Sequence, residues 1–379
     1  MEAHHSAVTA RGRGFARVTG PTPRPEVLMT PAYVPGQRKI EGVSAPIKLS
    51  ANESPHGPGP RAIEIYHALA ADLFRYPDGA QSDLRRTVAR VHGLEPDRLV
   101  FGNGSDEIIQ MLCRAYIAAG DEVILSQHSF MMCRVHALAQ GAALLTAPEP
   151  DFRVSVDEIL QRVTPRTKLV AIASPNNPCG TYLPAPELRR LHAALPEQVI
   201  LLVDAAYSEY ATASDYDNGS ILARSAPNVI MTRTFSKLYG LAGLRIGWAL
   251  ASAQIIRAIE HLRMPFNVNA VAQAVAAAAV ADVQHSAYVR EYNLRERERV
   301  SHACRDLGLQ VVPSSANFVL ILFGDPRRTA DGAYRHLISR GIIPRPMGGA
   351  PENALRITIG LESENDAVLR AMREFVSGS

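Results

Sequence analysis

The stretch TFSKLYGLAGLRIGW, residues 234–248, places Lys237 between Ser236 and a glycine-rich turn, and Arg245 follows eight positions later. The segments before and after the turn, NVIMTRTFSK (228–237) and LRIGWALA (244–251), are apolar, so each predicts a β-strand. Lys237 is therefore expected at the end of a strand, and a solvated surface loop is the alternative. Open α/β sheets bind their ligands at strand ends of this kind.

Similar apolar runs recur along the chain and alternate with helical patterns. Strands are predicted by DEVILSQ (121–127), KLVAIASPNNPCG (168–180) and VILLVDAAY (199–207), and helices by SDEIIQMLCRAYIAAG (105–120) and AQIIRAIEHLR (253–263). Continuous apolar strands between helices are typical of parallel sheets that are covered on both faces. The sequence therefore predicts an α/β fold with a mainly parallel sheet flanked by helices.

The character of the sequence changes after about residue 265, where a long helical stretch (269–307) leads to short strands and a last helix. The pattern Ser363-Glu364-Asn365-Asp366 predicts a capping box at the start of that helix. These features predict a smaller α+β domain. We expect a disordered tail (1–25), an N-terminal segment that packs with the small domain (26–70), a large domain (71–268) and the small C-terminal domain (269–379).

Composition describes a globular protein and excludes two classes of partner. The 379 residues are 47% hydrophobic and 20% charged, enough to bury a large core. The formal charge of +3 arises entirely in residues 1–25, and the remainder holds 36 basic and 36 acidic residues. This balance gives no support to nucleic-acid binding. No apolar run reaches the roughly 18 residues that a membrane span needs, so we expect no membrane association.

The cysteines and the N-terminus bear on the compartment. The four cysteines show no C-x-x-C spacing and lie in apolar or motif segments, which favours free thiols in a reducing cytoplasm over disulfides or a metal site. Residues 1–25 contain four arginines and one acid without an apolar core, so a secretory signal is not expected. A transit peptide stays open beside a disordered tail.

The segment LVFGNGSDEIIQ (99–110) reads as a strand, a glycine turn and the start of a helix. Gly102 and Gly104 permit a tight turn, and Ser105 occupies the expected N-cap position. The first N–H groups of a helix form an anion site, although an ordinary βα turn would have the same pattern. With Ser236 and Arg245 as additional donors, the expected ligand is a phosphate dianion.

Asp204 follows the apolar run VILLV, and Tyr207 ends the segment DAAY. A buried carboxylate needs a cationic partner, which a protonated pyridine nitrogen would supply; an N-cap aspartate is the alternative. Lys237 would then reach an aldehyde on the same ring. Asn177 in SPNNPCG and Tyr207 could bind a ring hydroxyl, or they could be a turn residue and a core tyrosine. A phosphate site, a ring carboxylate and a Schiff-base lysine together describe pyridoxal 5′-phosphate.

Residues 30–376 resemble the histidinol-phosphate aminotransferase family, within the fold-type-I, class II aminotransferases that depend on pyridoxal phosphate. The resemblance rests on ten segments that occur in family order: LSANESPHGPGP, FRYPDG, GNGSDE, SPNNPCGT, VDAAY, TFSKLYGLAGLRIGW, PFNVN, SANFV, GIIPRP and LRITIG. It implies that the large domain (71–268) binds the cofactor.

The resemblance assigns a role to each site residue. Lys237 would form the Schiff base and carry the proton, with Asp204 at the ring nitrogen and Asn177 and Tyr207 at the ring oxygen. The residues implied to hold the phosphate are Gly104, Ser105, Asp106, Ser236 and Arg245, with Tyr76 reaching the phosphate of the neighbouring subunit of a homodimer. The residues implied to bind substrate are Arg345 and Arg356 at its anionic end, Asn177, and Tyr33 and Asn52 near the entrance.

The chain departs from the family pattern at three positions. Phe130 replaces the ring-stacking tyrosine and can still stack on a pyridine. Ala205 stands where the family has an acid, and Cys179 replaces the commoner threonine.

The implied activity is transfer of an amino group between L-histidinol phosphate and 2-oxoglutarate in histidine biosynthesis. An aromatic amino-acid aminotransferase is the alternative, a threonine-phosphate decarboxylase is a more distant one, and the sequence does not separate the first two. A ligand-sensing regulator with this fold would carry a DNA-binding domain, for which the tail of about 25 residues is too short.

Overall fold

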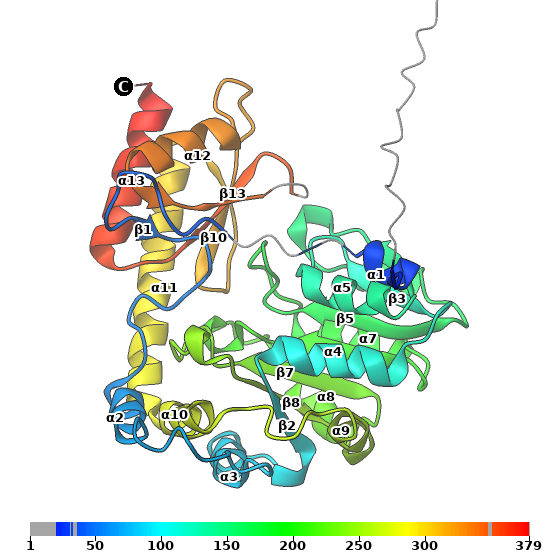
Figure 1. Cartoon of the computed structure of the whole chain (residues 1–379). Helices are drawn as coiled ribbons and strands as arrows, with labels where there is room; N and C mark the ends of the chain where they lie inside the picture. The colour runs from blue at the N-terminus through cyan, green and yellow to red at the C-terminus, as the bar shows by residue number, and fades with distance from the viewer. Residues whose placement is uncertain (1–19, 31, 33–35, 348–350, 379) are drawn as a thin grey trace, which may run out of the picture.

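The computed structural model describes residues 20–30, 32, 36–347 and 351–378. Its centre is a seven-stranded sheet (Figure 1). In spatial order the strands are β2 (Leu99–Gly102), β8 (Gly247–Ala251), β7 (Val229–Thr234), β6 (Ile200–Asp204), β5 (Thr167–Ala173), β3 (Glu122–Ser126) and β4 (Ala143–Ala147). All adjacent pairs from β7 to β4 are parallel, and β8 runs antiparallel to both β7 and β2. The predicted α/β fold with a mainly parallel sheet is confirmed.

Alternate residues of each strand enter different core clusters because a strand points successive side chains to opposite faces. On β6, Leu201 and Val203 belong to one cluster and Ile200 and Leu202 to the other. The second cluster is completed by α4 (Ser105–Tyr116), α5 (Met131–Ala139) and α9 (Ala253–Glu260). The first is completed by α3 (Ser82–His92), α6 (Val156–Leu160), α7 (Ala185–Ala194), α8 (Ser220–Ser225) and α10 (Ala270–Ala281). Burial on both faces explains why these strands are mostly apolar.

Four short 3₁₀ segments connect elements around this sheet, within the described residues. They are η1 (Pro96–Arg98), η2 (Pro150–Phe152), η3 (Ser208–Tyr210) and η4 (Ala242–Leu244). The last one, with Arg245 at φ 52°, explains why β8 begins at Gly247 rather than at the first residue of the apolar segment 244–251.

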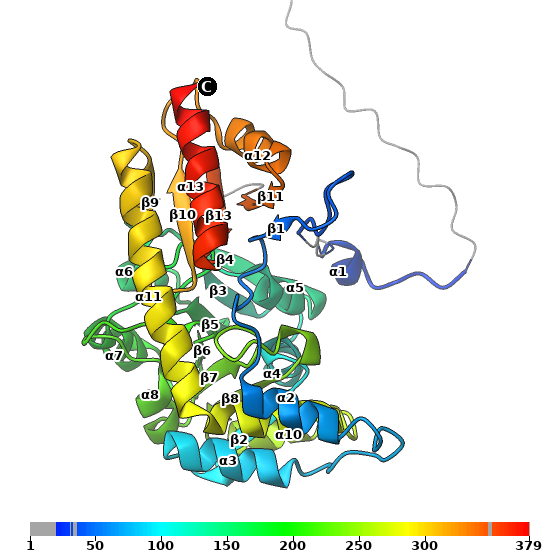
Figure 2. The same ribbon diagram turned by 90° about the vertical axis from the view of Figure 1, so that its left-hand side faces the viewer.

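A second, antiparallel sheet follows in the chain. Its strand order is β12 (Arg345–Pro346), β13 (Ala354–Thr358), β10 (Phe318–Leu322) and β9 (Gln310–Val312). It packs with α11 (Val283–Asp306), α12 (Ala330–Ser339) and α13 (Glu362–Ser377). Figure 2 shows α11 running from the helices beneath the large sheet to the smaller sheet, where it lies beside α13. The predicted domain boundaries stay a prediction.

The N-terminal segment packs with both the smaller unit and the helices of the large unit. The strand β1 (Ile47–Lys48) pairs in parallel with β11 (Ile342–Ile343), and Leu49 joins the core of the smaller unit. Downstream, α2 (Pro60–Ala68) packs on α10, while α1 (Pro25–Leu28) lies against α5. The site residues of segment 50–53 are therefore held between these two anchored parts.

Three details differ from the sequence prediction. The helix α4 begins at Ser105 with Gly104 as its N-cap, because only glycine readily adopts the φ of 80° found there. The predicted helical stretch 269–307 is two helices that meet at Asp282, whose side chain caps the second. The last helix begins at Glu362, and Glu364 accepts a hydrogen bond from the Leu361 N–H at 2.7 Å, so Ser363 is not its N-cap.

Several expectations concern residues beyond the sheets. All four cysteines are unpaired and buried. Among the described residues, no helix is both long and apolar enough to cross a membrane. Of the predicted tail (1–25), residues 1–19 lie outside the described residues.

Candidate active site

Three predicted site residues follow three adjacent strands of the large sheet. Asp204 ends β6, Asn177 follows β5 and Lys237 follows β7, and the sheet order places β6 between β5 and β7. Because the three strands are parallel, their carboxyl ends lie at the same edge. The structure therefore brings these three segments together as the sequence predicted.

Asp204 is a carboxylate in a nearly apolar setting. The Thr232 hydroxyl on β7 donates a hydrogen bond to its Oδ1 at 3.1 Å. Burial nevertheless raises the pKa of Asp204 to about 6, against the lowering by Thr232 and the Ala206 N–H, and Asp106 raises it further. A carboxylate in this setting favours a cationic partner.

Lys237 is partly buried, and its amine faces several charged groups. Its Nζ donates to the Ala51 carbonyl oxygen at 3.1 Å and lies 5.7 Å from the centre of the Tyr207 ring. Burial lowers the pKa of Lys237 to about 8, and the nearby Arg356 and Arg245 lower it too, whereas Glu53 and Asp204 oppose them. A lysine with this pKa has a substantial uncharged fraction near neutral pH, which a nucleophile or proton acceptor requires.

The glycine turn before α4 lies close to the Arg245 guanidinium. A Cβ on Gly104 would lie 2.7 Å from Arg245 Nη2, which is the movable end of a long side chain, so it is the positive φ of 80° that requires glycine here. Arg245 Nη1 donates to Ser236 Oγ at 3.4 Å, which joins the turn to the segment before Lys237. The first N–H groups of α4 have no partner within the helix by its geometry. Together with Ser236 and Arg245 they are the donors from which the sequence predicts an anion cradle.

The Glu107 side chain holds the glycine turn in place. Its Oε2 accepts from the Asn103 N–H at 2.7 Å and from Asn267 Nδ2 at 2.9 Å. The glutamate thus fixes the turn from below, and glycine in its place would lose both bonds.

Asn52 is buried at the base of the site, only 1% exposed, although we expected it near the entrance. Its Nδ2 donates to Tyr207 Oη at 2.8 Å. Two residues hold Asn52. Asn317 Nδ2 donates to the Asn52 carbonyl oxygen at 3.0 Å, and the Asn52 N–H donates to Thr358 Oγ1 at 3.0 Å. Because Asn52 donates to the phenol oxygen, the Tyr207 O–H is directed to another acceptor.

Two arginines lie directly opposite each other on the smaller sheet. Arg345 on β12 and Arg356 on β13 are register partners, so their side chains leave the same face. Arg356 donates to the Ser50 carbonyl oxygen at 2.7 Å and to Asn177 Oδ1, and its guanidinium lies 5.3 Å from the Phe318 ring centre. Like charges directly opposite each other are unfavourable unless an anion compensates them.

The remaining predicted residues lie apart or face elsewhere. Asp106 directs its carboxylate to His136 Nε2 at 3.0 Å. Phe130 precedes α5 and is 37% exposed. Tyr76 is 83% exposed and stacks on Phe266 with ring centres 4.7 Å apart, so within one chain it does not join the cluster. Tyr33 lies outside the described residues.

Sequence reasoning missed several groups that position the site. Thr232, Asn317 and Thr358 bond Asp204 or Asn52, and the Ala51 carbonyl accepts from Lys237. All but Thr232 lie inside segments that carried the family resemblance, so the signal was present, but their partners depend on the fold.

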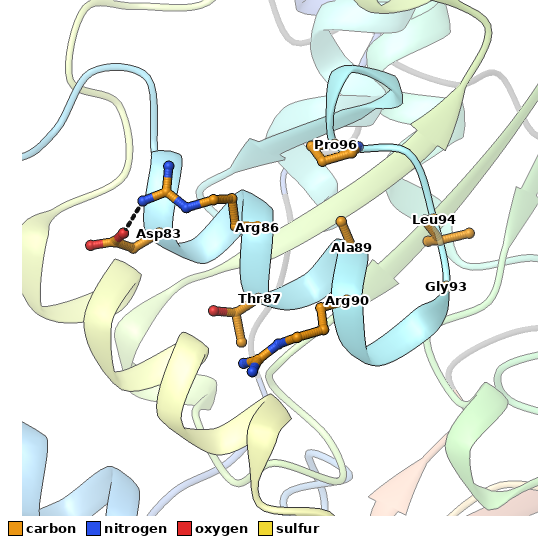
Figure 3. Close-up of a pocket in the computed structure, with 8 residues that line it drawn as sticks. All are labelled: Asp83, Arg86, Thr87, Ala89, Arg90, Gly93, Leu94 and Pro96. Atoms are coloured by element: carbon orange, nitrogen blue, oxygen red, sulfur yellow. Dashed lines mark hydrogen bonds and ion pairs between the residues drawn. The ribbon is translucent and has the colours of Figure 1, made fainter.

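A surface pocket on α3 is separate from this site. Figure 3 shows its lining along α3 and the following turn, where Arg86 pairs with Asp83. Its lining contains none of the predicted site residues. Among the described residues, no group of three or more histidine, cysteine or acidic side chains is arranged to hold a metal ion.

Comparison with known proteins connects this geometry to a family. The profile of the family "Aminotransferase class I and II" matches residues 44–372. This chain belongs to that family. The membership predicted from the motifs is confirmed, and the aminotransferase fold accounts for the strand-end position of Lys237 and Asp204.

Individual aminotransferases resemble the chain over nearly its full length. A histidinol-phosphate aminotransferase of Paramagnetospirillum magneticum is 45% identical over 95% of this chain and 99% of its own length. The same-named protein of Rhodospirillum centenum is 43% identical over 95% of this chain and all of its own. The structure of histidinol-phosphate aminotransferase from Sinorhizobium meliloti, in complex with pyridoxal 5′-phosphate, has a TM-score of 0.86 at 31% identity and covers 97% of this chain and 99% of its own.

Proposed function

We propose that this chain is a histidinol-phosphate transaminase that uses pyridoxal 5′-phosphate. It would transfer the amino group of L-histidinol phosphate to 2-oxoglutarate, giving imidazole acetol phosphate and glutamate in histidine biosynthesis. The observation that carries the proposal is the register pair Arg345 and Arg356 beside Asn177, because two guanidinium groups suit a phosphate dianion and also a carboxylate. The near-full-length similarity to proteins of that name supports it.

The donor set fits this cofactor. Asp204, whose pKa is raised, would face the cationic ring nitrogen, and Asn177 and Tyr207 would bind the ring oxygen. Phe130, which precedes α5 and is partly exposed, would stack on the ring. The glycine-dependent cradle would bind the phosphate through Gly104, Ser105, Asp106, Ser236 and Arg245. Since the Asp106 carboxylate turns to His136, we assign its backbone N–H to the phosphate.

When bound, pyridoxal phosphate supplies an aldehyde for the amino group and a ring that accepts the electron pair released at the substrate α-carbon. Lys237 would accept the proton that leaves the substrate α-carbon. Its lowered pKa keeps part of the Nζ amine uncharged for this role. Asn52, whose Nδ2 donates to Tyr207 Oη at 2.8 Å, would orient Tyr207 toward the ring oxygen. Arg345 and Arg356 would hold the substrate anion.

A homodimer is the second part of the proposal. Tyr76 is useful to a phosphate site only if it reaches the partner subunit, and it lies in an exposed apolar patch. The patch contains Leu73, Phe74, Tyr76, Met264 and Phe266, each at least 44% exposed. Apolar patches of this kind mark protein interfaces. We also propose a cytoplasmic location, which the four buried free cysteines support.

A panel of amino donors tests the proposed activity. With 2-oxoglutarate as acceptor, kcat/KM for histidinol phosphate is expected to exceed that for phenylalanine by at least about tenfold, or about 1.4 kcal/mol. A preference for phenylalanine would replace the assignment with an aromatic aminotransferase.

Sizing over a dilution series tests the dimer, since a fully active monomer would overturn the role given to Tyr76.

A further inference from the structure

A buried carboxylate lies beneath the loop that carries Asn177. Glu149 is 5% exposed, follows β4 and precedes η2, and lies outside the set of residues assigned to cofactor or substrate. Its Oε1 accepts a hydrogen bond from Asn176 Nδ2 at 2.9 Å. Asn176 is fully buried, so the pair is shielded from water.

The bonds of Asn176 are directional. Its Oδ1 accepts from the Asn177 N–H at 2.8 Å, its own N–H donates to the Thr181 carbonyl at 2.7 Å, and its carbonyl accepts from the Gly180 N–H at 2.7 Å. An ionised carboxylate only accepts hydrogen bonds, so Glu149 forces the NH₂ end of the Asn176 amide toward itself. The oxygen end must then face the Asn177 N–H.

This chain of bonds leads to the substrate arginine. Asn177 Oδ1 accepts a hydrogen bond from Arg356 Nη1, while Arg356 Nη2 donates to the Ser50 carbonyl at 2.7 Å. The orientation of the Arg356 guanidinium therefore depends on where the Asn177 side chain lies, and the backbone of Asn177 is held by Asn176.

We infer that Glu149 is a positioning residue for the substrate anion, acting through Asn176 and Asn177 on the Arg356 guanidinium. The inference rests on the proposed function only in that Arg356 binds an anionic substrate; it does not depend on which amino donor is used.

The surroundings of Glu149 allow its charge to change near neutral pH. Burial raises the pKa of Glu149 to about 7, against the lowering by Ser126, the His128 N–H, Asn176 and Cys179. Among the described residues, the titratable group in contact with Glu149 is the Cys179 thiol, which lies 3.9 Å from Oε2 and whose own pKa burial raises; His128 contributes only its backbone N–H. A protonated Glu149 can donate as well as accept, so it no longer imposes one orientation on Asn176.

Three variants separate positioning from mere structural support. Glu149→Leu removes the hydrogen-bond acceptor, and Glu149→Gln keeps an acceptor that can also donate. The control Glu122→Gln changes a buried glutamate at the amino end of β3, away from Asn177, where it pairs with Arg166. For each holoenzyme, we would measure KM and kcat with glutamate, the Kd of succinate by calorimetry between pH 6 and 8.5, and the thermal unfolding midpoint.

We expect Glu149→Leu to raise the KM for glutamate and the Kd of succinate by about tenfold, with a smaller change in kcat. Glu149→Gln should lie between wild type and the leucine variant and should lose the part of the pH dependence of the succinate Kd that wild type shows around pH 7. Glu122→Gln should leave the succinate Kd and its pH dependence unchanged.

Two results would overturn the inference. One is a lowered unfolding midpoint in Glu149→Leu with an unchanged succinate Kd, since that describes structural support alone. The other is a succinate Kd in Glu149→Gln with the same pH dependence as wild type. A low kcat/KM with histidinol phosphate would contradict the proposed amino donor, but it would not affect the inference on Glu149, which is tested with glutamate and succinate.

Discussion

Asp204 and Glu209 lie five residues apart, but only the Glu209 carboxylate is paired with a buried arginine. Glu209 Oε1 accepts from Arg233 Nη2 at 2.6 Å, and both side chains are at most 8% exposed. The Arg233 guanidinium also lies 5.2 Å from the Trp248 ring centre. Asp204 has the Thr232 hydroxyl at 3.1 Å, and burial raises its pKa to about 6.

This difference separates a charge that serves the fold from one directed at a ligand. The Glu209–Arg233 pair compensates itself inside the protein, so breaking it should cost stability. Asp204 is held in its charged form at a cost, and such a cost is typical of binding and catalytic positions. The same contrast applies to the cations, with Arg233 in the core and Lys237, Arg345 and Arg356 around the proposed substrate.

The strongest test of the ligand-directed group is Lys237→Ala. Without the amine that we propose to move the proton, turnover should fall by about 10⁴-fold, measured as single-turnover transamination of glutamate. The wild-type protein should be yellow with bound cofactor, and the variant should lose the wild-type absorption band. Its unfolding midpoint should stay close to wild type, and catalytic turnover by the variant would remove Lys237 from its role.

On the structural side, Glu209→Ala should lower the free energy of unfolding by about 3–5 kcal/mol, because Arg233 would keep a buried charge without its carboxylate. The folded fraction should retain its kcat within about threefold. The double variant Glu209→Leu/Arg233→Met should recover much of the lost stability, as measured by urea unfolding. A large loss of kcat in the folded variant would break the distinction between the two carboxylates.

Asp204→Asn should have the opposite effect on stability in the cofactor-free protein. Because the folded-state pKa of Asp204 is raised to about 6, its favourable contribution exists below the unfolded pKa of about 4 and is lost as pH rises through 6. Asparagine removes that loss, so the variant should gain up to about 2 kcal/mol at pH 8 and little at pH 4. Urea unfolding at both pH values measures the gain, and cofactor affinity should fall. Equal effects at the two pH values would contradict the assigned cause.

The sequence predicted the part of the site that local pattern determines. Strand ends follow from apolar runs that stop at a polar residue, and parallel strands bring their carboxyl ends to one edge, so Asn177, Asp204 and Lys237 converge as expected. Helix starts were less certain, since Gly104 rather than Ser105 caps α4.

Contacts between distant segments could not be read from local pattern. Asn52 bonds Tyr207 across 155 positions, and Glu149 meets Asn176 across 27, because sheet order and loop packing decide which segments touch. The register of Arg345 opposite Arg356 likewise depends on the pairing of β12 with β13. The proposed role of Tyr76 depends on a second subunit, and the only indication of that subunit in a single described chain is the exposed apolar patch around Tyr76.

The smallest expected effect concerns Arg345, which should distinguish two anions. A phosphate dianion should use both guanidinium groups through charge-assisted bonds of about 1.5–3 kcal/mol each, whereas a single-charge carboxylate needs less. Arg345→Ala should therefore lower kcat/KM for histidinol phosphate about tenfold more than for phenylalanine, a difference of about 1.4 kcal/mol. Arg345→Lys serves as the matched variant, since it keeps the charge but lacks the planar fork. If Arg345 were instead structural, both donors would suffer equally and the unfolding midpoint would fall, which would return Arg345 to the class of Arg233 and favour the aromatic alternative.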